Sequence, residues 1–311
     1  MRRRGTLLWV VFALISIAGV LALSNAARAT YPGTNNGRIA FGMNVGGNVD
    51  IYSALPNGND LRRLTTDPSF DACAAYSPSG KEIAFCSNRS GNFEIWAMKQ
   101  NGTQEHQVTH TGGRMIFPDF SPDGTKIAFS GHLPGGTNED IFVANADGSG
   151  LQQLTSDPGM DAYPAWSPDG SKIAFISDRS GVEQVWVMDA NGDNPTQLTT
   201  DPNTHDQLPD WSPDGTKIAY QDVIGGSGRI FVMDANGDNP TQLTFGPGDD
   251  FGAAWSPDGS QIAFVRNFGN GDRPVMLMNA DGSDQHPLTG HGAVQFVPGW
   301  QARGERIDHT P

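Results

Sequence analysis

A short polar turn followed by an apolar run recurs five times along this chain of 311 residues. The turn reads SPSG at residue 77 and SPDG at residues 121, 167, 212 and 256, so successive copies lie 44 to 46 residues apart. Each turn is followed by an I-A-aromatic run and preceded by an aromatic residue: Tyr76, Phe120, Trp166, Trp211 and Trp255. A motif repeated at this interval is typical of a structural module, so the fold must be built from similar units.

Each unit reads as four short strands joined by tight turns. In the third copy the strands are the segment ending in PAW, then KIAFIS, QVWVMDA and PTQLT. The third strand places valines on one face and Trp186 and Met188 on the other, so both faces of the sheet should be covered. Pro168-Asp169-Gly170 fits a type I turn, and Asn191-Gly192 fits the connection between the third and fourth strands.

A four-stranded unit of about 45 residues with two apolar faces needs a neighbour on each side, and such units arranged in a ring form a β-propeller. The first repeat begins at Arg38 with second-strand sequence, and the chain ends with a lone first-strand sequence around Trp300. We therefore predict an all-β, six-bladed propeller of four-stranded antiparallel blades over residues 30–311. Pairing of the N- and C-terminal strands should close the ring.

The first 29 residues have the features of a secretory signal peptide. Arg2, Arg3 and Arg4 form a basic start, residues 7–23 are almost entirely apolar, and Ala27-Arg28-Ala29 supplies the small residues that a signal peptidase accepts. We predict cleavage after Ala29 and export to the periplasm or the extracellular space, with no stable membrane insertion after cleavage. The alternative is that the apolar run is retained as a membrane anchor.

The charge of the chain limits its partners. Removal of residues 1–29 would take away four arginines and no acidic residue, and would change the formal net charge from −14 to −18. Such a charge repels nucleic acid and anionic lipid, so we predict no nucleic-acid partner. It favours a protein or peptide of basic character, or a divalent cation such as calcium; no other cofactor is expected.

The two cysteines, Cys73 and Cys86, flank the SPSG turn. If the strands on either side of this turn pair as a hairpin, the cysteines lie opposite each other or one residue away from it. An oxidising compartment permits a disulfide at this place, although the geometry between antiparallel strands is tight. The sequence leaves open whether the residues form a disulfide or two buried thiols.

The segment PAWSPDGSKIAFISDRSG, followed by VWVMDANGDNPTQLT, resembles the WD-like repeat of the TolB-type β-propellers. The resemblance covers residues 38–307 and implies a periplasmic component of a cell-envelope complex. TolB carries an α/β domain before its propeller, whereas only about eight residues separate the predicted signal peptide from the first blade here. We therefore expect a TolB-like propeller without that N-terminal domain.

An acidic residue stands six residues before four of the turn serines: Asp71, Asp161, Asp206 and Asp250. Because these residues enter the innermost strands, we expect them to ring one mouth of the central channel and to bind a cation or a basic peptide. His205 is included in this candidate partner site, and His291 could face the same mouth. The alternative is that each aspartate caps its own loop through backbone amides.

Other charged residues are interpreted as structural. The turn aspartates Asp123, Asp169, Asp214 and Asp258 should bond nearby backbone, since the first turn has serine at the same place. Arg89 and Arg179 should form charge pairs that hold their loops. Asp119 and Asp210 replace a small residue in the inner strand, so each must find a partner or water.

Two classes of function fit these features, and we predict no catalytic residue. The first is an exported, non-catalytic propeller that binds a protein or peptide at the acidic mouth as a monomer. The second is a propeller enzyme, either a hydrolase or a metal-dependent polysaccharide lyase, because propeller-type oligogalacturonate lyases are similar in fold and hold a metal through histidines. The seven histidines of this chain show no spacing typical of a metal site.

Overall fold

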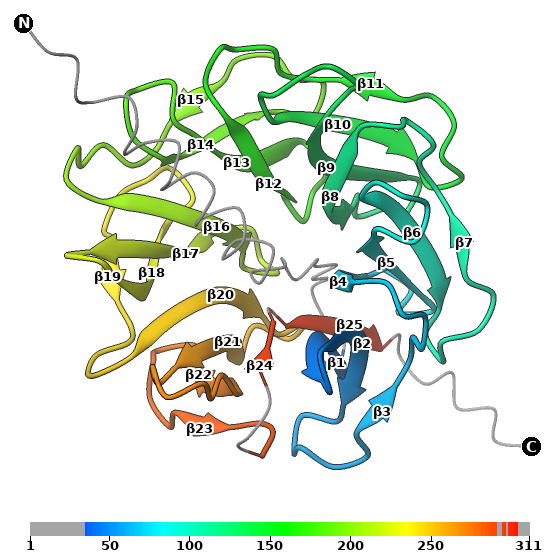
Figure 1. Cartoon of the computed structure of the whole chain (residues 1–311). Helices are drawn as coiled ribbons and strands as arrows, with labels where there is room; N and C mark the ends of the chain where they lie inside the picture. The colour runs from blue at the N-terminus through cyan, green and yellow to red at the C-terminus, as the bar shows by residue number, and fades with distance from the viewer. Residues whose placement is uncertain (1–34, 291–293, 297, 304–311) are drawn as a thin grey trace, which may run out of the picture.

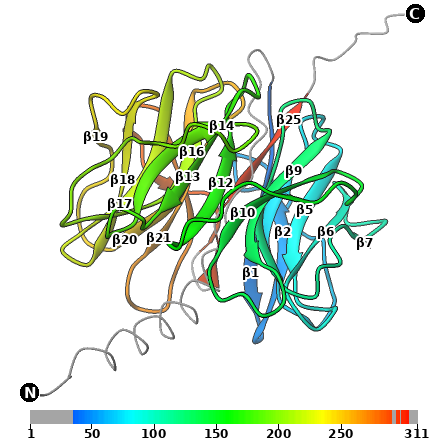
Figure 2. The same ribbon diagram turned by 90° about the horizontal axis from the view of Figure 1, so that it is seen from above.

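The computed structural model describes residues 35–290, 294–296 and 298–303, and all regular structure in these ranges is β-strand. Six blades surround a common axis (Figure 1), and the strands run between the two faces of the ring (Figure 2). The predicted six-bladed propeller is confirmed. The predicted signal peptide (residues 1–29) and His291 lie outside the described residues. Within those ranges no helix is long and apolar enough to cross a membrane.

Each blade is an antiparallel sheet whose first strand is innermost. Blade 1 consists of β4 (Asp71–Tyr76), β5 (Glu82–Ser87), β6 (Glu94–Lys99) and β7 (His106–Gln107). Blade 2 consists of β8 (Arg114–Phe120), β9 (Lys126–His132), β10 (Asp140–Asn145) and β11 (Gln152–Gln153). Blade 3 consists of β12 (Asp161–Trp166), β13 (Lys172–Ser177), β14 (Gln184–Asp189) and β15 (Thr196–Gln197).

The remaining blades follow the same order. Blade 4 consists of β16 (His205–Trp211), β17 (Lys217–Ile224), β18 (Ser227–Asp234) and β19 (Thr241–Gln242). Blade 5 consists of β20 (Asp249–Trp255), β21 (Gln261–Asn267), β22 (Val275–Asn279) and β23 (His286–Pro287). Blade 6 consists of β24 (Val294–Gln295), β25 (Gly299–Arg303), β1 (Asn35–Val45), β2 (Asn48–Ala54) and β3 (Arg62–Arg63).

Blade 6 joins the two ends of the described chain, as predicted. The C-terminal strand β25 pairs with the N-terminal strand β1, with Trp300 opposite Ile39, and β24 continues this pairing with Gln295 opposite Met43. The Trp300 indole donates a hydrogen bond to the Ala254 carbonyl of blade 5, at 3.1 Å. Backbone pairing within blade 6 and side-chain packing against blade 5 therefore close the ring together.

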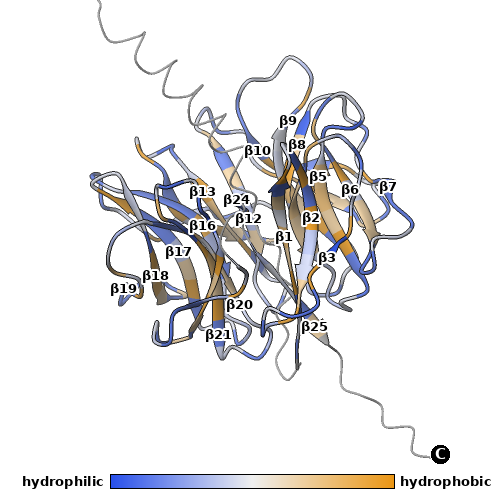
Figure 3. Cartoon of the chain, turned by 60° about the horizontal axis from the view of Figure 1, so that its bottom comes forward, coloured by the Kyte–Doolittle hydropathy of each residue, from blue (hydrophilic) through white to orange (hydrophobic). Residues whose placement is uncertain are grey.

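Each blade presents large side chains to the preceding blade and small side chains to the following one. In blade 3, Ile173 and Phe175 pack with Ile141 of blade 2, whereas Ala174 packs with Trp211 of blade 4. Successive residues of a strand face opposite sides of its sheet, so the I-A-aromatic run serves two seams at once. Figure 3 shows the result as apolar strands and hydrophilic loops. The repeated motif therefore determines which side chains of neighbouring blades pack together.

The inner strands of blades 1 to 5 interrupt their pairing at one equivalent point. A β-bulge begins there with a residue of positive φ: Cys73, Phe117, Tyr163, Leu208 and Gly252. The four side chains of this set are buried in one cluster, although they come from four blades. The rings of Phe117 and Tyr163 lie 4.5 Å apart between their centroids. Apolar side chains therefore surround the axis.

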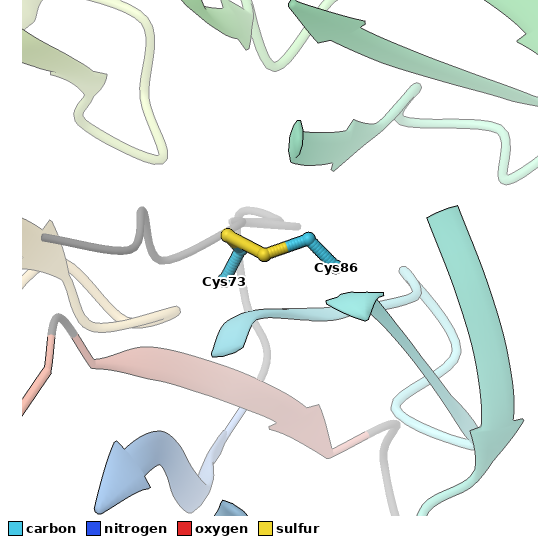
Figure 4. Close-up of a disulfide and its surroundings, with 2 residues drawn as sticks. All are labelled: Cys73 and Cys86. Carbon is cyan, nitrogen blue, oxygen red and sulfur yellow. A yellow bond between two sulfur atoms is a disulfide. The ribbon is translucent and has the colours of Figure 1, made fainter. Parts of the chain in front are cut away.

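Cys73 and Cys86 are joined by a disulfide on the side of β4 that faces the axis (Figure 4). Cys86 pairs with Ala72 in the sheet, so the cysteines are one residue from direct opposition, within the expected range. The bulge at Cys73 turns its side chain to the same side as that of Cys86 and brings the two Cα atoms to 5.5 Å.

Replacement of Trp300 tests the closure of the ring. Trp300→Ala should lower the free energy of unfolding by roughly 3–5 kcal/mol, because it removes a fully buried indole. Trp300→Phe keeps most of the packing and should cost only about 1–2 kcal/mol, mainly from the lost hydrogen bond. Urea unfolding measures both values. Leu61→Ala, at a site 49% exposed, is the control and should change stability very little. A Trp300→Ala variant as stable as the native protein would contradict this account of closure.

Removal of the disulfide should also destabilise the fold. Cys73→Ala together with Cys86→Ala opens a link between residues 13 apart, and should lower the free energy of unfolding by about 3 kcal/mol. Urea unfolding of the native protein with and without reductant gives an independent measurement of the same loss. An intact mass that does not rise by about 2 Da on reduction would show that the thiols are unlinked.

Candidate functional site

The four candidate aspartates lie where expected along the chain, but their side chains are buried. Asp71 and Asp161 begin the inner strands β4 and β12, and Asp206 and Asp250 are the second residues of β16 and β20. None of the four is more than 2% exposed. The side chains enter the seams between blades, so they do not form the exposed acidic ring that the sequence suggested. The side chains around the axis are the apolar ones described above.

Arginine neutralises the buried aspartate in blades 1 and 3. Arg89 Nη2 lies 2.6 Å from Asp71 Oδ2, and its guanidinium lies over the Trp96 ring, 4.8 Å from the centroid. Arg179 donates to both carboxylate oxygens of Asp161, at 2.9 and 2.7 Å. The Arg179 guanidinium covers the ring of Trp186 in the same way, at 5.0 Å. The interpretation of these arginines as charge pairs that hold their loops is confirmed.

Blade 5 reaches the same arrangement from a different position in the sequence. Arg266 is the cross-strand partner of Asp250 and donates to both of its oxygens, at 2.6 and 2.9 Å. Its guanidinium lies 5.3 Å from the centre of the Phe264 ring. A buried aspartate, an arginine and an aromatic ring thus recur in three blades, and we call this set the Asp-Arg-aromatic motif. Buried ion pairs of this kind need such additional contacts to offset their desolvation.

Blade 4 keeps the aspartate but has no arginine in the loop. Asp206 lies opposite Asp222 in the pairing of β16 and β17, and Ile224 stands where Arg179 stands in blade 3. Among the described residues, Asp206 Oδ1 is buried without a hydrogen-bond partner. Burial raises the pKa of Asp206 to about 7, and the neighbouring charges of Asp222 and Asp201 add to this effect. Burial also raises the pKa of Asp222 above its usual range.

His205 lies beside this acidic pair on the surface. Its Nδ1 is 3.6 Å from Glu183 Oε2, and its side chain is half exposed. The interaction with Glu183 raises the pKa of His205 above the ordinary value for histidine. His205 and Asp206 are consecutive residues of β16, and the structure places Asp222 opposite Asp206 and Glu183 beside His205, two acidic residues that were not predicted as part of the site.

The turn aspartates are structural, as predicted. Asp123 Oδ1 accepts hydrogen bonds from the hydroxyl of Ser121, at 2.6 Å, and from the backbone amide of Thr125, at 2.9 Å. These bonds hold the pKa of Asp123 below its usual range. Equivalent bonds fix the other three turns. The DANGDN loops are tight turns as well, in which Asn191 and Asn194 bond to Asp193 and Asp189.

Asp119 and Asp210 link neighbouring blades. Asp119 accepts a hydrogen bond from the backbone amide of Trp166 in blade 3, at 2.7 Å. Asp210 accepts one from the amide of Trp255 in blade 5, at 2.6 Å. The expectation that each must find a partner is confirmed, because a backbone amide of the next blade fulfils that need.

A threonine at the start of each of five connections between blades has a structural role that was not predicted from the sequence. Its hydroxyl accepts a hydrogen bond from the backbone amide of a third-strand residue, as Thr199 does from Val185 at 2.9 Å. The equivalent residues are Thr65, Thr109, Thr155 and Thr244. The signal was present in the sequence as the apolar-Thr pair that follows each fourth strand.

A cavity of about 1170 Å³ lies between blades 6 and 1 at the end of the ring that carries the SPDG turns, and Arg38, Arg62 and Lys81 line it. Both arginines pair with Asp60. Over the described ranges no group of three or more histidine, cysteine or acidic side chains is placed to hold a metal ion.

The fold and the buried motifs define a β-propeller with WD-like repeats. Comparison with protein families gives a more specific assignment: the model of the TolB beta propeller domain matches residues 16–131, 107–222 and 203–310. The chain therefore belongs to the TolB β-propeller domain family. No curated protein matches it by sequence.

Solved structures agree with this fold. The chain superposes on TolB from Acinetobacter baumannii with a TM-score of 0.76 and 23% identity, over 85% of this chain and 66% of that chain. A putative TolB from Agrobacterium tumefaciens gives a TM-score of 0.68 and 21% identity, over 87% and 92%. An oligogalacturonate lyase in complex with manganese gives 0.59 and 16%, over 86% and 76%. At these identities the similarity concerns the fold alone.

Because the pKa of Asp206 is raised, the folded protein should become less stable as the pH increases. A carboxyl whose pKa rises from 3.8 to about 7 on folding binds more protons in the folded state, so stability is lost as the pH increases between these values. Asp206→Asn removes this loss. The variant should gain about 2–3 kcal/mol on the native protein between pH 5 and pH 8, measured by urea unfolding. Asp193→Asn, at an exposed turn residue, is the control. An equal pH dependence of Asp206→Asn and native protein would contradict the raised pKa.

Proposed function

We propose that this protein is an exported, non-catalytic propeller that binds a protein or peptide in the periplasm or outside the cell. The binding surface is the end of the ring formed by the loops between second and third strands and by the connections between blades. We call this end the connector face. Asp71, Asp161, Asp206 and Asp250 lie near it, at the starts of the inner strands.

The observation that carries the proposal is the uneven distribution of exposed apolar side chains. Five of the seven large ones among the described residues lie at the connector face: Leu133, Phe245 and Phe268 in its loops, and Val45 and Ile224 at the ends of β1 and β17. Phe245 is 67% exposed. Four of the five belong to consecutive blades 4, 5 and 6. Exposed apolar groups gathered on one side of a soluble protein are typical of a surface that binds another protein.

The chemistry of the partner follows from charge. The described connector face combines apolar tips with acidic side chains such as Asp201 and Glu183, in a chain of net charge −14. A partner segment with aliphatic or aromatic residues beside arginine or lysine is complementary to both features. Export is supported by the sequence of residues 1–29, and family membership is consistent with it. We propose that the chain acts as a monomer.

The alternative is a propeller enzyme, for which the specific support is the fold similarity to an oligogalacturonate lyase. Such an enzyme would cleave polygalacturonate in a manner that depends on added manganese and is lost with a chelator. This assay is therefore run beside the binding experiment below.

Selection of random peptides on the immobilised chain tests the binding function. We expect enrichment of peptides in which arginine or lysine stands next to aliphatic or aromatic residues. Phe245→Ser together with Phe268→Ser should weaken binding of the enriched peptides at least about tenfold, because the apolar contacts are lost.

Leu61→Ser together with Leu151→Ser is the matched control, since these leucines are also exposed, at 49% and 42%, and lie in loops at the other end of the ring. This double variant should bind the peptides as the native protein does. Failure to enrich any peptide, with manganese-dependent cleavage of polygalacturonate, would replace the binding function by the enzymatic one.

A further inference from the structure

Because the six blades share one sequence pattern, equivalent residues of different blades can be compared. Where the buried aspartate has its arginine, the guanidinium lies between the carboxylate and one or two aromatic rings, as Arg179 does with Phe175 and Trp186. Blade 4 has Tyr220 and Phe231 at the positions of these two rings, with the centroids 5.8 Å apart. Blade 4 therefore has the carboxylate and the rings of the Asp-Arg-aromatic motif without its arginine.

The charge around Asp206 is not balanced by the rest of the described chain. Asp222 lies opposite it in the sheet, and Asp201 and Asp222 both act on it electrostatically. Arg229 is the cross-strand neighbour of Asp222, but its guanidinium donates to the carbonyls of Gly228, Gly246 and Gly248.

His205, whose charge lowers the pKa of Asp206, has its own acidic partner in Glu183. Asp206 itself is 2% exposed, and its Oδ1 has no hydrogen-bond partner among the described residues. The Thr199 side chain forms a hydrogen bond with Asp206, but among the described residues no arginine or lysine pairs with it. A buried carboxylate without a cationic partner is costly unless a cation or a proton binds to it.

We propose that the seam between blades 3 and 4 binds an arginine side chain of the partner polypeptide, which occupies the place that Arg179 takes in blade 3. This inference rests on the proposed function and names the residues that recognise the partner. The guanidinium donates to Asp206 and Asp222 and stacks on Tyr220 or Phe231. Asp222 and Phe231 are only partly buried, so the seam is open to solvent on their side.

Two observations favour an arginine over a metal ion. The rings of Tyr220 and Phe231 offer faces that stabilise a flat organic cation, whereas a calcium ion needs six or more oxygen ligands. Ile224 ends β17 of blade 4 and Phe245 lies in the connection from blade 4 to blade 5, so a partner segment that reaches blade 4 from the connector face meets exposed apolar side chains there. A basic segment with apolar neighbours fits both features.

The test uses a peptide enriched in the selection described above, and the same peptide with its arginine replaced by citrulline, which has the same shape but no charge. Calorimetry with the native protein should give an affinity at least about tenfold higher for the arginine form. Equal affinities of the two forms would overturn the proposal. Calcium chloride is titrated in parallel, and calcium binding that displaces the arginine peptide from Asp206 would overturn it in favour of a metal site.

Asp222→Arg is the sharpest variant, because it copies blade 5, where Arg266 is the cross-strand partner of Asp250. The new arginine should pair with Asp206 within the chain, raise the unfolding temperature at pH 8 and weaken the arginine peptide at least about tenfold. Asp206→Asn should weaken the peptide without adding a competing charge. Asp193→Asn is the control and should change neither the unfolding temperature nor the affinity for the arginine peptide.

The outcomes separate this inference from the proposed function. If the native protein enriches no peptide, protein binding itself fails. If the native protein and both variants, Asp222→Arg and Asp206→Asn, bind the peptides with equal affinity, the protein-binding function is supported and the arginine site is refuted. A more stable Asp222→Arg variant that has lost the peptide supports both.

Discussion

The structure depends on one packing constraint, the contact of a large-residue face of each blade with a small-residue face of the blade before it. Ile173 and Phe175 face blade 2, while Ala174 between them faces blade 4. Neither face of a blade is available to solvent, so no blade is stable without two neighbours. The ring must therefore be closed, and the pairing of β25 with β1 provides the last neighbour.

This constraint confines chemistry to the ends of the strands. Polar groups that enter a seam must be paired there, and different blades achieve this in different ways. Asp161 uses an arginine from the following loop, Asp250 uses one from the paired strand, and Asp119 uses a backbone amide of the next blade. The two arginine pairs lie within one blade and hold its inner strand to the second strand or the loop after it, whereas the Asp119 bond links blade 2 to blade 3 and fixes these two blades relative to one another.

The spacing of the SPDG turns was sufficient to predict the fold, the number of blades and the sharing of blade 6, because strand period and turn chemistry are local properties. The environment of the aspartates was not predictable from their position. The direction in which Asp71 or Asp206 points depends on the seam, and whether it has a partner depends on loop residues such as Arg89 and Ile224. The bulges that turn residues such as Cys73 to the axis also left no local signal in the sequence.

A repeat protein contains its own comparison set, and this gives blade 4 its significance. Blades 1, 3 and 5 show that the aspartate at the start of the inner strand pairs with an arginine beside an aromatic ring. Blade 4 instead sets Asp222 against Asp206, an arrangement that by itself costs stability above the raised pKa of Asp206. A proton offsets that cost in acid, and a bound cation offsets it at neutral pH. Because of this pair, blade 4, which lacks the arginine, is the blade whose stability should increase most when a positively charged partner binds.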